Sequence, residues 1–183
     1  MLNQMLAHPE MIGMILKNTP TWVWGLFAGL AWLGLSQTRD RTASLARVSF
    51  VPIAMTLFSI WGMVAAFGNA PAFGYVMLVW LCAAAVVLSL FATREAPAGS
   101  SYDAASRTFT LRGSWVPMAI ILGIFLTKYI VGVSTSINPT LVRDSQFSLA
   151  VGAIYGLFTG MFVGRAARLW FLAGRATRGA IPA

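Results

Sequence analysis

Charged side chains are scarce in this 183-residue sequence and make up only 10% of it. A soluble domain normally carries about 25% charged residues, because these residues cover its water-exposed surface. Hydrophobic residues make up 58% of the chain, and its mean hydropathy is +0.75. The composition therefore argues against a soluble domain and predicts an integral membrane protein with one compact transmembrane domain.

Cysteine and histidine are almost absent, with Cys82 and His8 as the single examples. One cysteine excludes an internal disulfide and a multi-cysteine metal site, and one histidine excludes bis-histidine haem ligation within one chain. The sequence has no HExxH motif, glycine-rich phosphate loop or CxxC motif, and it shows no serine–histidine–aspartate triad. We therefore expect neither an enzyme nor a bound metal or other cofactor.

Apolar segments alternate with short polar ones, and each long segment is a candidate helix that crosses the bilayer. A helix needs about 20 apolar residues to span the bilayer. The first segment is shorter, so it must lie nearly perpendicular to the membrane plane, thin the bilayer locally or include flanking residues. The predicted fold is an all-α, five-transmembrane-helix bundle within residues 19–170. Its spans are expected at about residues 21–35, 48–67, 75–92, 115–135 and 147–163.

Basic residues are distributed unevenly between the loops. If there are five spans, ten of the 13 basic residues lie on one side of the membrane: Arg39, Arg41, Arg47, Arg94, Arg107, Arg112, Arg165, Arg168, Arg175 and Arg178. The positive-inside rule then predicts a periplasmic N-terminus, a cytoplasmic C-terminus and a basic cytoplasmic tail at residues 171–183 of a bacterial inner-membrane protein. These arginines are expected to contact lipid headgroups, not nucleic acid.

Two segments outside the spans have a pattern of their own. Residues 1–18 place apolar side chains at near-helical spacing and predict a short interfacial helix on the outer side. Residues 99–113 alternate Tyr102, Phe109 and Leu111 around a polar turn, which predicts a small cytoplasmic β-hairpin. Neither segment carries a catalytic set of residues.

Lys128 is the residue that stands out, because it lies within the fourth span. An ionisable side chain at such a depth is costly and is often functional, although a lysine near a helix end can also extend to the interface. No aspartate or glutamate occurs in any span. Counting residues along the helices brings Trp61, Trp80 and Tyr155 to a similar depth, so we expect aromatic rings to hold the ammonium by cation–π attraction.

Glycine recurs every fourth residue in the last span, at Gly152, Gly156, Gly160 and Gly164, and Gly25 and Gly29 repeat the spacing in the first. Such a stripe favours close helix packing of the GxxxG type. The partner could be another helix of this chain, a second copy in a homo-oligomer, or a lipid or other ligand.

Three stretches carry a resemblance to known proteins. They are RTASLARVSFVPIAMTLFSIWG, YDAASRTFTLRGSWVPMAIILGIFLTKYIVG and GAIYGLFTGMFVGRAARLW. Their order resembles that of uncharacterised small inner-membrane proteins of Gram-negative bacteria and, more distantly, of CcdC-like membrane proteins. The CcdC resemblance implies a link to cytochrome c maturation.

The residues and the resemblance together give two expectations of function. The first is a non-enzymatic membrane protein that binds or transports a small anionic or lipid ligand near Lys128. The second is an accessory or scaffold protein that associates with itself or with another membrane protein, with a role like that in cytochrome c maturation as one version. Membrane lipids are expected partners in both.

Overall fold

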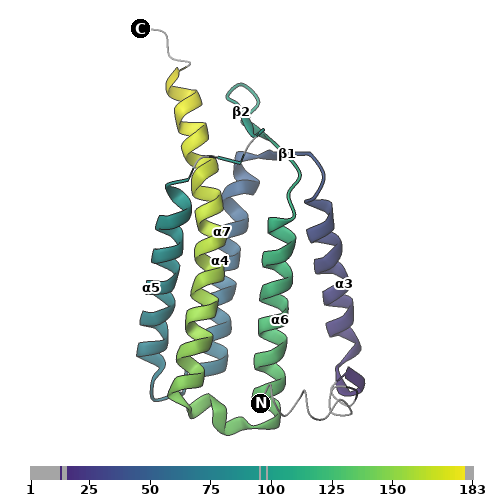
Figure 1. The fold of residues 1–183 in the computed structure, drawn as a ribbon, viewed down its shortest axis with the longest axis vertical. Helices are drawn as coiled ribbons and strands as arrows, with labels where there is room; N and C mark the ends of the chain where they lie inside the picture. Colours follow the sequence, from purple (N-terminus) through teal and green to yellow (C-terminus); the bar gives the residue numbers. More distant parts are fainter. Residues whose placement is uncertain (1–12, 14–15, 95, 98, 180–183) are drawn as a thin grey trace.

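The protein is a bundle of near-parallel helices with a small sheet at one end (Figure 1). The computed structural model describes residues 13, 16–94, 96–97 and 99–179. The helices are α3 (Thr21–Ser36), α4 (Leu45–Phe67), α5 (Phe73–Ala92), α6 (Val116–Ile137), η1 (Pro139–Arg143) and α7 (Ser145–Gly179), and the strands are β1 (Arg41–Ser44), β2 (Ser101–Asp103) and β3 (Thr108–Leu111). Most of the predicted interfacial segment, residues 1–18, lies outside the described residues.

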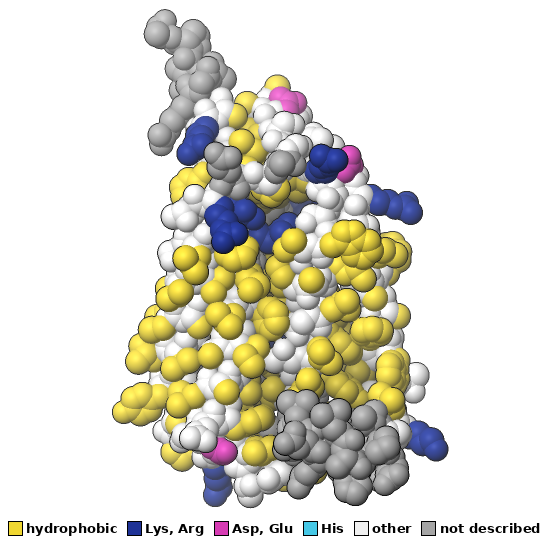
Figure 2. All heavy atoms as spheres, in the orientation of Figure 1, with side chains coloured by type: hydrophobic (Ala, Val, Ile, Leu, Met, Phe, Trp, Pro, Cys, Tyr) yellow, Lys and Arg dark blue, Asp and Glu magenta, His cyan; other side chains and the backbone are white. Residues whose placement is uncertain are grey.

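Four of the described helices, α4, α5, α6 and α7, are long and apolar enough to cross a membrane. The fifth apolar helix, α3, has only 16 residues, so the predicted count of five spans is not confirmed. Exposed hydrophobic side chains cover the visible face of the bundle in a broad band, and basic side chains gather where that band ends (Figure 2). These features are compatible with a membrane protein.

Helix α7 includes the predicted span and most of the predicted tail. The sequence predicts a span at residues 147–163 and a basic tail at residues 171–183, and one helix runs from Ser145 to Gly179. At about 1.5 Å per residue its 35 residues extend about 52 Å, well beyond the ~30 Å hydrocarbon core of a bilayer. Its C-terminal turns therefore project past the other helices (Figure 1).

The polar end of the bundle carries a three-stranded antiparallel sheet in the order β1-β3-β2. Phe109 of β3 is fully buried between Tyr102 of β2 and Ala43 of β1 in the register. The sequence predicts a small β-hairpin at residues 99–113, which is not confirmed as such, because β1 also pairs with β3 and continues into α4. At the β2–β3 turn, hydrogen bonds from Ser106 and from the Ala105 N–H hold the pKa of Asp103 below its usual value.

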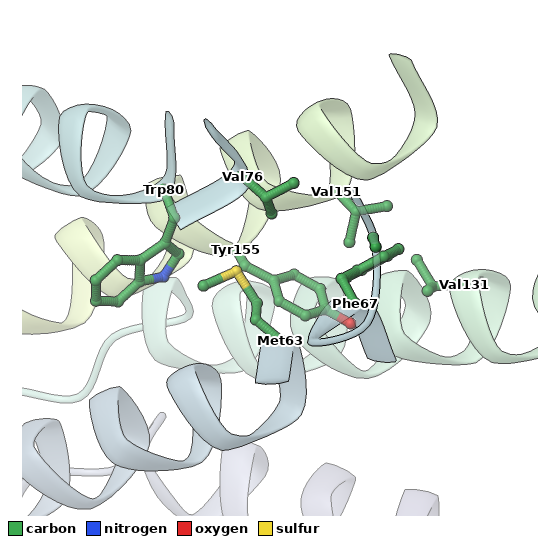
Figure 3. Packing of buried hydrophobic residues seen from close by; sticks show 8 residues of the cluster. Met63, Phe67, Val76, Trp80, Val131, Val151 and Tyr155 are labelled. Carbon is green, nitrogen blue, oxygen red and sulfur yellow. The ribbon is translucent and has the colours of Figure 1, made fainter. Parts of the chain in front are cut away.

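The helices form two groups that differ in how tightly they pack. Helix α7 packs most extensively against α5 and also contacts α4, and α3 packs against α6. The hydrophobic core lies within the first group and includes Met63, Phe67, Val76, Trp80 and Tyr155 (Figure 3). Helix α6 adds Val131 to this core and so connects the two groups.

Helix α3 runs antiparallel along α6, as three contacts show. Gly34 of α3 lies against Met118 near the start of α6, and the rings of Phe27 and Phe125 are 5.1 Å apart. At the other end, the hydroxyls of Thr19 and Tyr129 are hydrogen bonded at 2.6 Å. This pair of helices forms one wall of the candidate site.

Candidate binding groove around Lys128

A large groove separates the α3–α6 pair from α4. Its volume is about 1210 Å³, above the usual 300–1,000 Å³ of small-molecule sites. Apolar side chains from α3, α4 and α6 make up most of its wall, including Leu26, Leu30, Met55, Ile121 and Phe125. The described wall of the groove is therefore mainly apolar.

Polar groups in the groove wall are few. Asn18, Thr19, Tyr129 and Ser136 contribute to the wall, and all four lie toward the η1 end of the α3–α6 pair. Among the lining residues that the structure describes, Lys128 is the single charged side chain. The groove thus combines a long apolar surface with one positive charge.

Two aromatic rings hold the Lys128 ammonium. Its Nζ atom lies 4.7 Å from the centre of the Phe58 ring on α4 and 4.8 Å from the centre of the Tyr155 ring on α7. Both distances are within the range of a cation–π interaction, which is worth about 2 kcal/mol or more when desolvated. The ammonium therefore lies between α4, α6 and α7, with one ring from α4 and one from α7 beside it.

A second, much smaller cavity also borders Lys128. It has a volume of about 30 Å³, room for about two water molecules, and its wall includes Ser59, Tyr155, Thr159 and Lys128. The Ser59 Oγ accepts hydrogen bonds of 3.3 Å from the Trp80 indole and from the Thr159 hydroxyl. Lys128 and Phe58 line both the small cavity and the groove, and the walls of both spaces are mainly apolar.

Gly62 of α4 makes room for the ammonium. A Cβ atom added at Gly62 would lie 2.8 Å from Lys128 Nζ, which is closer than real side chains approach. The absence of a side chain here therefore helps to set the position of the charge. This role could not be predicted from the sequence, because Gly62 is isolated and belongs to no repeated spacing.

The four predicted ligand-binding residues are only partly brought together. Tyr155 contacts Lys128, whereas Trp61 is 65% exposed on the outside of α4 with its ring 5.9 Å from Phe58. Trp80 is buried in the core and donates to Ser59 (Figure 3). The expectation that Trp61 and Trp80 hold the ammonium is corrected, since Phe58 supplies the second ring.

The glycine stripe of α7 is packed against α5 of the same chain. Added Cβ atoms would lie 2.9 Å from Val76 at Gly152, 2.6 Å from the Ala84 carbonyl oxygen at Gly160 and 2.6 Å from Phe91 Cβ at Gly164. At Gly156 the Cβ would overlap the Trp80 carbonyl oxygen. Of the partners left open by the sequence, α5 is the one that occupies this face.

Gly25 and Gly29 share the same spacing but have no such partner. An added Cβ atom at either position would meet nothing within 4 Å. Within the described part of the chain, therefore, no close contact supports the prediction that these two glycines mediate helix packing. Among the described residues there is also no group of three or more histidine, cysteine or acidic side chains that could hold a metal.

Comparison with family models gives one match over nearly the whole sequence. Residues 1–179 match the model of a family of unknown function, DUF6622. The chain belongs to this family. The searches of curated proteins and of solved structures found no match, and no resemblance to CcdC-like proteins was found.

Proposed function

We propose that this protein is a non-enzymatic bacterial inner-membrane protein that binds or carries an anionic amphiphile in the groove between α3, α4 and α6. The observation that supports this proposal is the groove itself, about 1210 Å³ in volume and mainly apolar, with Lys128 as its charged residue. The hydrocarbon chain of the ligand lies along the groove, and its anionic group contacts Lys128.

The surroundings of Lys128 favour an anionic partner. The two rings that flank Nζ can offset part of the free-energy cost of removing the ammonium from water. They carry no negative charge, however, and so cannot neutralise it. Among the described residues, the carboxylates of Asp40, Asp103 and Asp144 instead bind local N–H and hydroxyl groups. A carboxylate or phosphate brought in by a ligand would supply the missing negative charge.

The orientation of the bundle is part of the proposal. Arginines gather at the end that carries the sheet, and by the positive-inside rule we assign that end to the cytoplasm. In this arrangement α3 is a fifth, short span that lies antiparallel to α6. An Arg107→Cys variant should react with a membrane-impermeant thiol reagent only after the cells are permeabilised. Labelling of intact cells would show that the sheet end faces the outside and that the assigned orientation is wrong.

The scaffold alternative has less support. It required either the glycine stripe or the arginine-rich surface to be covered by another chain, and the stripe is already packed against α5. No observation favours a role like that in cytochrome c maturation. We therefore keep ligand binding as the proposed function.

The test compares two ligands that differ only at the head. Oleate and oleyl alcohol share the same chain, but only oleate is negatively charged. Binding to the purified protein in mild detergent should be about tenfold tighter for oleate, as expected for one charge-assisted contact. The Lys128→Met variant should lose this preference while it still binds the alcohol.

A matched control removes a lysine outside the groove. Lys17 is exposed and is not among the lining residues, so the Lys17→Met variant should keep the preference for oleate. Thermal unfolding of each variant in the absence of ligand checks that it is folded. If Lys128→Met retains the wild-type preference for oleate, the proposal is wrong.

A further inference from the structure

The small cavity beside Lys128 adjoins the groove, because the two spaces have much of their wall in common. The residues that line both are Met55, Phe58, Ile124, Lys128 and Phe162. The rest of the cavity wall comes from α4 and α7 and consists of Ser59, Tyr155, Phe158 and Thr159. A ligand that lies in the groove could therefore place a small terminal group in this cavity.

Ser59 has a proton available for a group in the cavity. Its Oγ accepts hydrogen bonds of 3.3 Å from the Trp80 indole and from the Thr159 hydroxyl. A serine hydroxyl has one donor and two acceptor positions, so these two bonds use its acceptor positions and leave its donor. Within the described part of the chain, no hydrogen bond is donated by Ser59 Oγ. Ser59 can therefore donate to a ligand without losing the bonds it already accepts.

The Lys128 ammonium is the other donor in the cavity wall. It has three N–H groups, and its contacts with the described residues are to the rings of Phe58 and Tyr155. The Thr159 hydroxyl, in contrast, already donates a 2.8 Å hydrogen bond to the Tyr155 carbonyl oxygen. The cavity thus offers one neutral and one positively charged donor, which suits an acceptor with negative charge.

The size of the cavity limits what that acceptor can be. Its volume of about 30 Å³ has room for about two water-sized atoms, which matches the two oxygens of a carboxylate. The Phe158 ring cannot move toward α6 to enlarge it, because a Cβ added at Gly123 would lie 2.9 Å from Phe158 Cζ. A phosphate that carries an esterified alcohol is too large for this space.

The position of Lys128 along α6 also favours a carboxylate. Lys128 is 12 residues from Val116 and nine from Ile137, so it lies about 18 Å and 14 Å from the two ends of the helix. A phospholipid could bring its phosphate to this depth only by burying the rest of its polar head, which is costly. A fatty acid would bury only two oxygens, and both could be bound by Ser59 and Lys128.

We propose that the small cavity binds the carboxylate of a fatty acid whose hydrocarbon chain lies in the groove. Ser59 donates a hydrogen bond to one carboxylate oxygen, and the Lys128 ammonium binds the other. This proposal rests on the proposed function and goes beyond it in two respects. It selects a carboxylate among the possible anionic heads, and it assigns Ser59 as the residue that recognises it together with Lys128.

Three ligands with the same oleyl chain test the proposal: oleate, oleoyl lysophosphatidylglycerol and oleyl alcohol. Oleate and the lysophospholipid each carry one negative charge, but only the head of oleate fits the cavity. The full-length wild type in mild detergent should bind oleate about tenfold more tightly than the lysophospholipid, since the larger head cannot reach both donors. Equal binding of these two ligands would overturn the proposal.

The Ser59→Ala variant tests the second donor. It should bind oleate about tenfold more weakly and oleyl alcohol as the wild type does, because a hydrogen bond to a charged group is lost. Ser136→Ala is the matched control, since Ser136 also lines the groove but donates to the Gly132 carbonyl oxygen of its own helix. This control should bind oleate within about twofold of the wild type.

Thermal unfolding without ligand checks that both serine variants are folded. Wild-type affinity for oleate in folded Ser59→Ala, or an equal loss in Ser136→Ala, would show that Ser59 does not bind the carboxylate. If Ser59→Ala does not fold, the comparison of oleate with the lysophospholipid in the wild type still decides the question.

The alcohol separates a failure of this proposal from a failure of the proposed function. If the wild type binds oleate no more tightly than oleyl alcohol, both are wrong. If it prefers oleate to the alcohol but binds the lysophospholipid equally well, only the carboxylate assignment is wrong. Acetate at constant ionic strength should not displace oleate. Displacement by acetate that requires Ser59 would show that the cavity binds free carboxylates, and the assignment to a fatty acid would be wrong.

Discussion

The α5–α7 interface and the groove between α3, α4 and α6 are built from similar helices but packed in opposite ways. At the interface, glycines let α7 approach the α5 backbone so closely that a single methyl group would not fit. At the groove, large side chains line a space of about 1210 Å³ that protein atoms leave open. One region brings two helices into close contact, and the other keeps α4 apart from the α3–α6 pair.

This difference indicates where to look for function. In a membrane, helices associate without a hydrophobic driving force and depend on close backbone packing. The stripe of α7 supplies such packing, so its regular spacing relates to stability. Lys128 lies at the junction of the two regions, where Tyr155 of the packed half and Phe58 flank it.

The largest expected effect is at the interface. Gly156→Ala would place a methyl group on the Trp80 carbonyl oxygen and 2.9 Å from Ala83 Cβ, and neither can move without shifting α5. We expect a loss of about 1–3 kcal/mol in the free energy of unfolding, as for other overpacked cores. Unfolding in mixed micelles with increasing dodecyl sulfate measures this loss.

Gly25→Ala provides the matched control for this substitution. The added methyl would meet nothing within 4 Å, and alanine has the higher helix propensity, so the free energy of unfolding should rise by up to about 1 kcal/mol. Equal destabilisation by the two substitutions would mean that the spacing of the glycines, and not their contact with α5, determines the effect.

Gly62→Ala is expected to change stability less than Gly156→Ala does, and its main effect should be on ligand binding. The methyl of Gly62→Ala would meet only Lys128 Nζ, the end of a flexible side chain, so the free energy of unfolding should change by less than about 1 kcal/mol. Displacing the ammonium from its rings should weaken oleate binding about two- to fivefold. Gly132→Ala, with open space at the same groove, should leave oleate binding unchanged.

The smallest expected effect is at the contact between α3 and α6. Tyr129→Phe removes the 2.6 Å hydrogen bond between Tyr129 and Thr19 at the end of the groove. Hydrogen bonds between membrane helices contribute about 0.6 kcal/mol on average, so the free energy of unfolding should fall by about that amount. A loss as large as that of Gly156→Ala would show that the α3–α6 pair is as tightly packed as the α5–α7 interface.

The long helices could be predicted from the sequence, because the length of an apolar segment and the spacing of its residues indicate a helix. The long apolar runs correspond to α4, α5, α6 and α7, and Tyr155, one of the two rings beside Lys128, was predicted. The strand β1 was missed because its four residues, RTAS, show no apolar alternation before the helix begins. The basic tail was predicted, but its continuation of α7 was not, because basic residues are compatible with a helix and with an irregular tail.

The remaining errors have a common physical cause. Residue counts along a helix give depth but not direction, so Trp61 and Trp80 were placed near Lys128 although one faces outward and the other lies in the core. Phe58, at a suitable depth and facing Lys128, could be found only with the helices in place. In the same way, Gly25 and Gly156 each lie four residues from another glycine, and only the bundle shows which one faces another helix.

The most direct test of the central claim is cross-linking with a photoreactive fatty acid, followed by mass spectrometry to locate the modified residues. The account predicts modification of groove residues on α3 and α6, such as Leu26 and Phe125, and its loss in the Lys128→Met variant. Modification spread evenly over the exposed face of α5, including Leu78 and Leu81, and unchanged in that variant would contradict it.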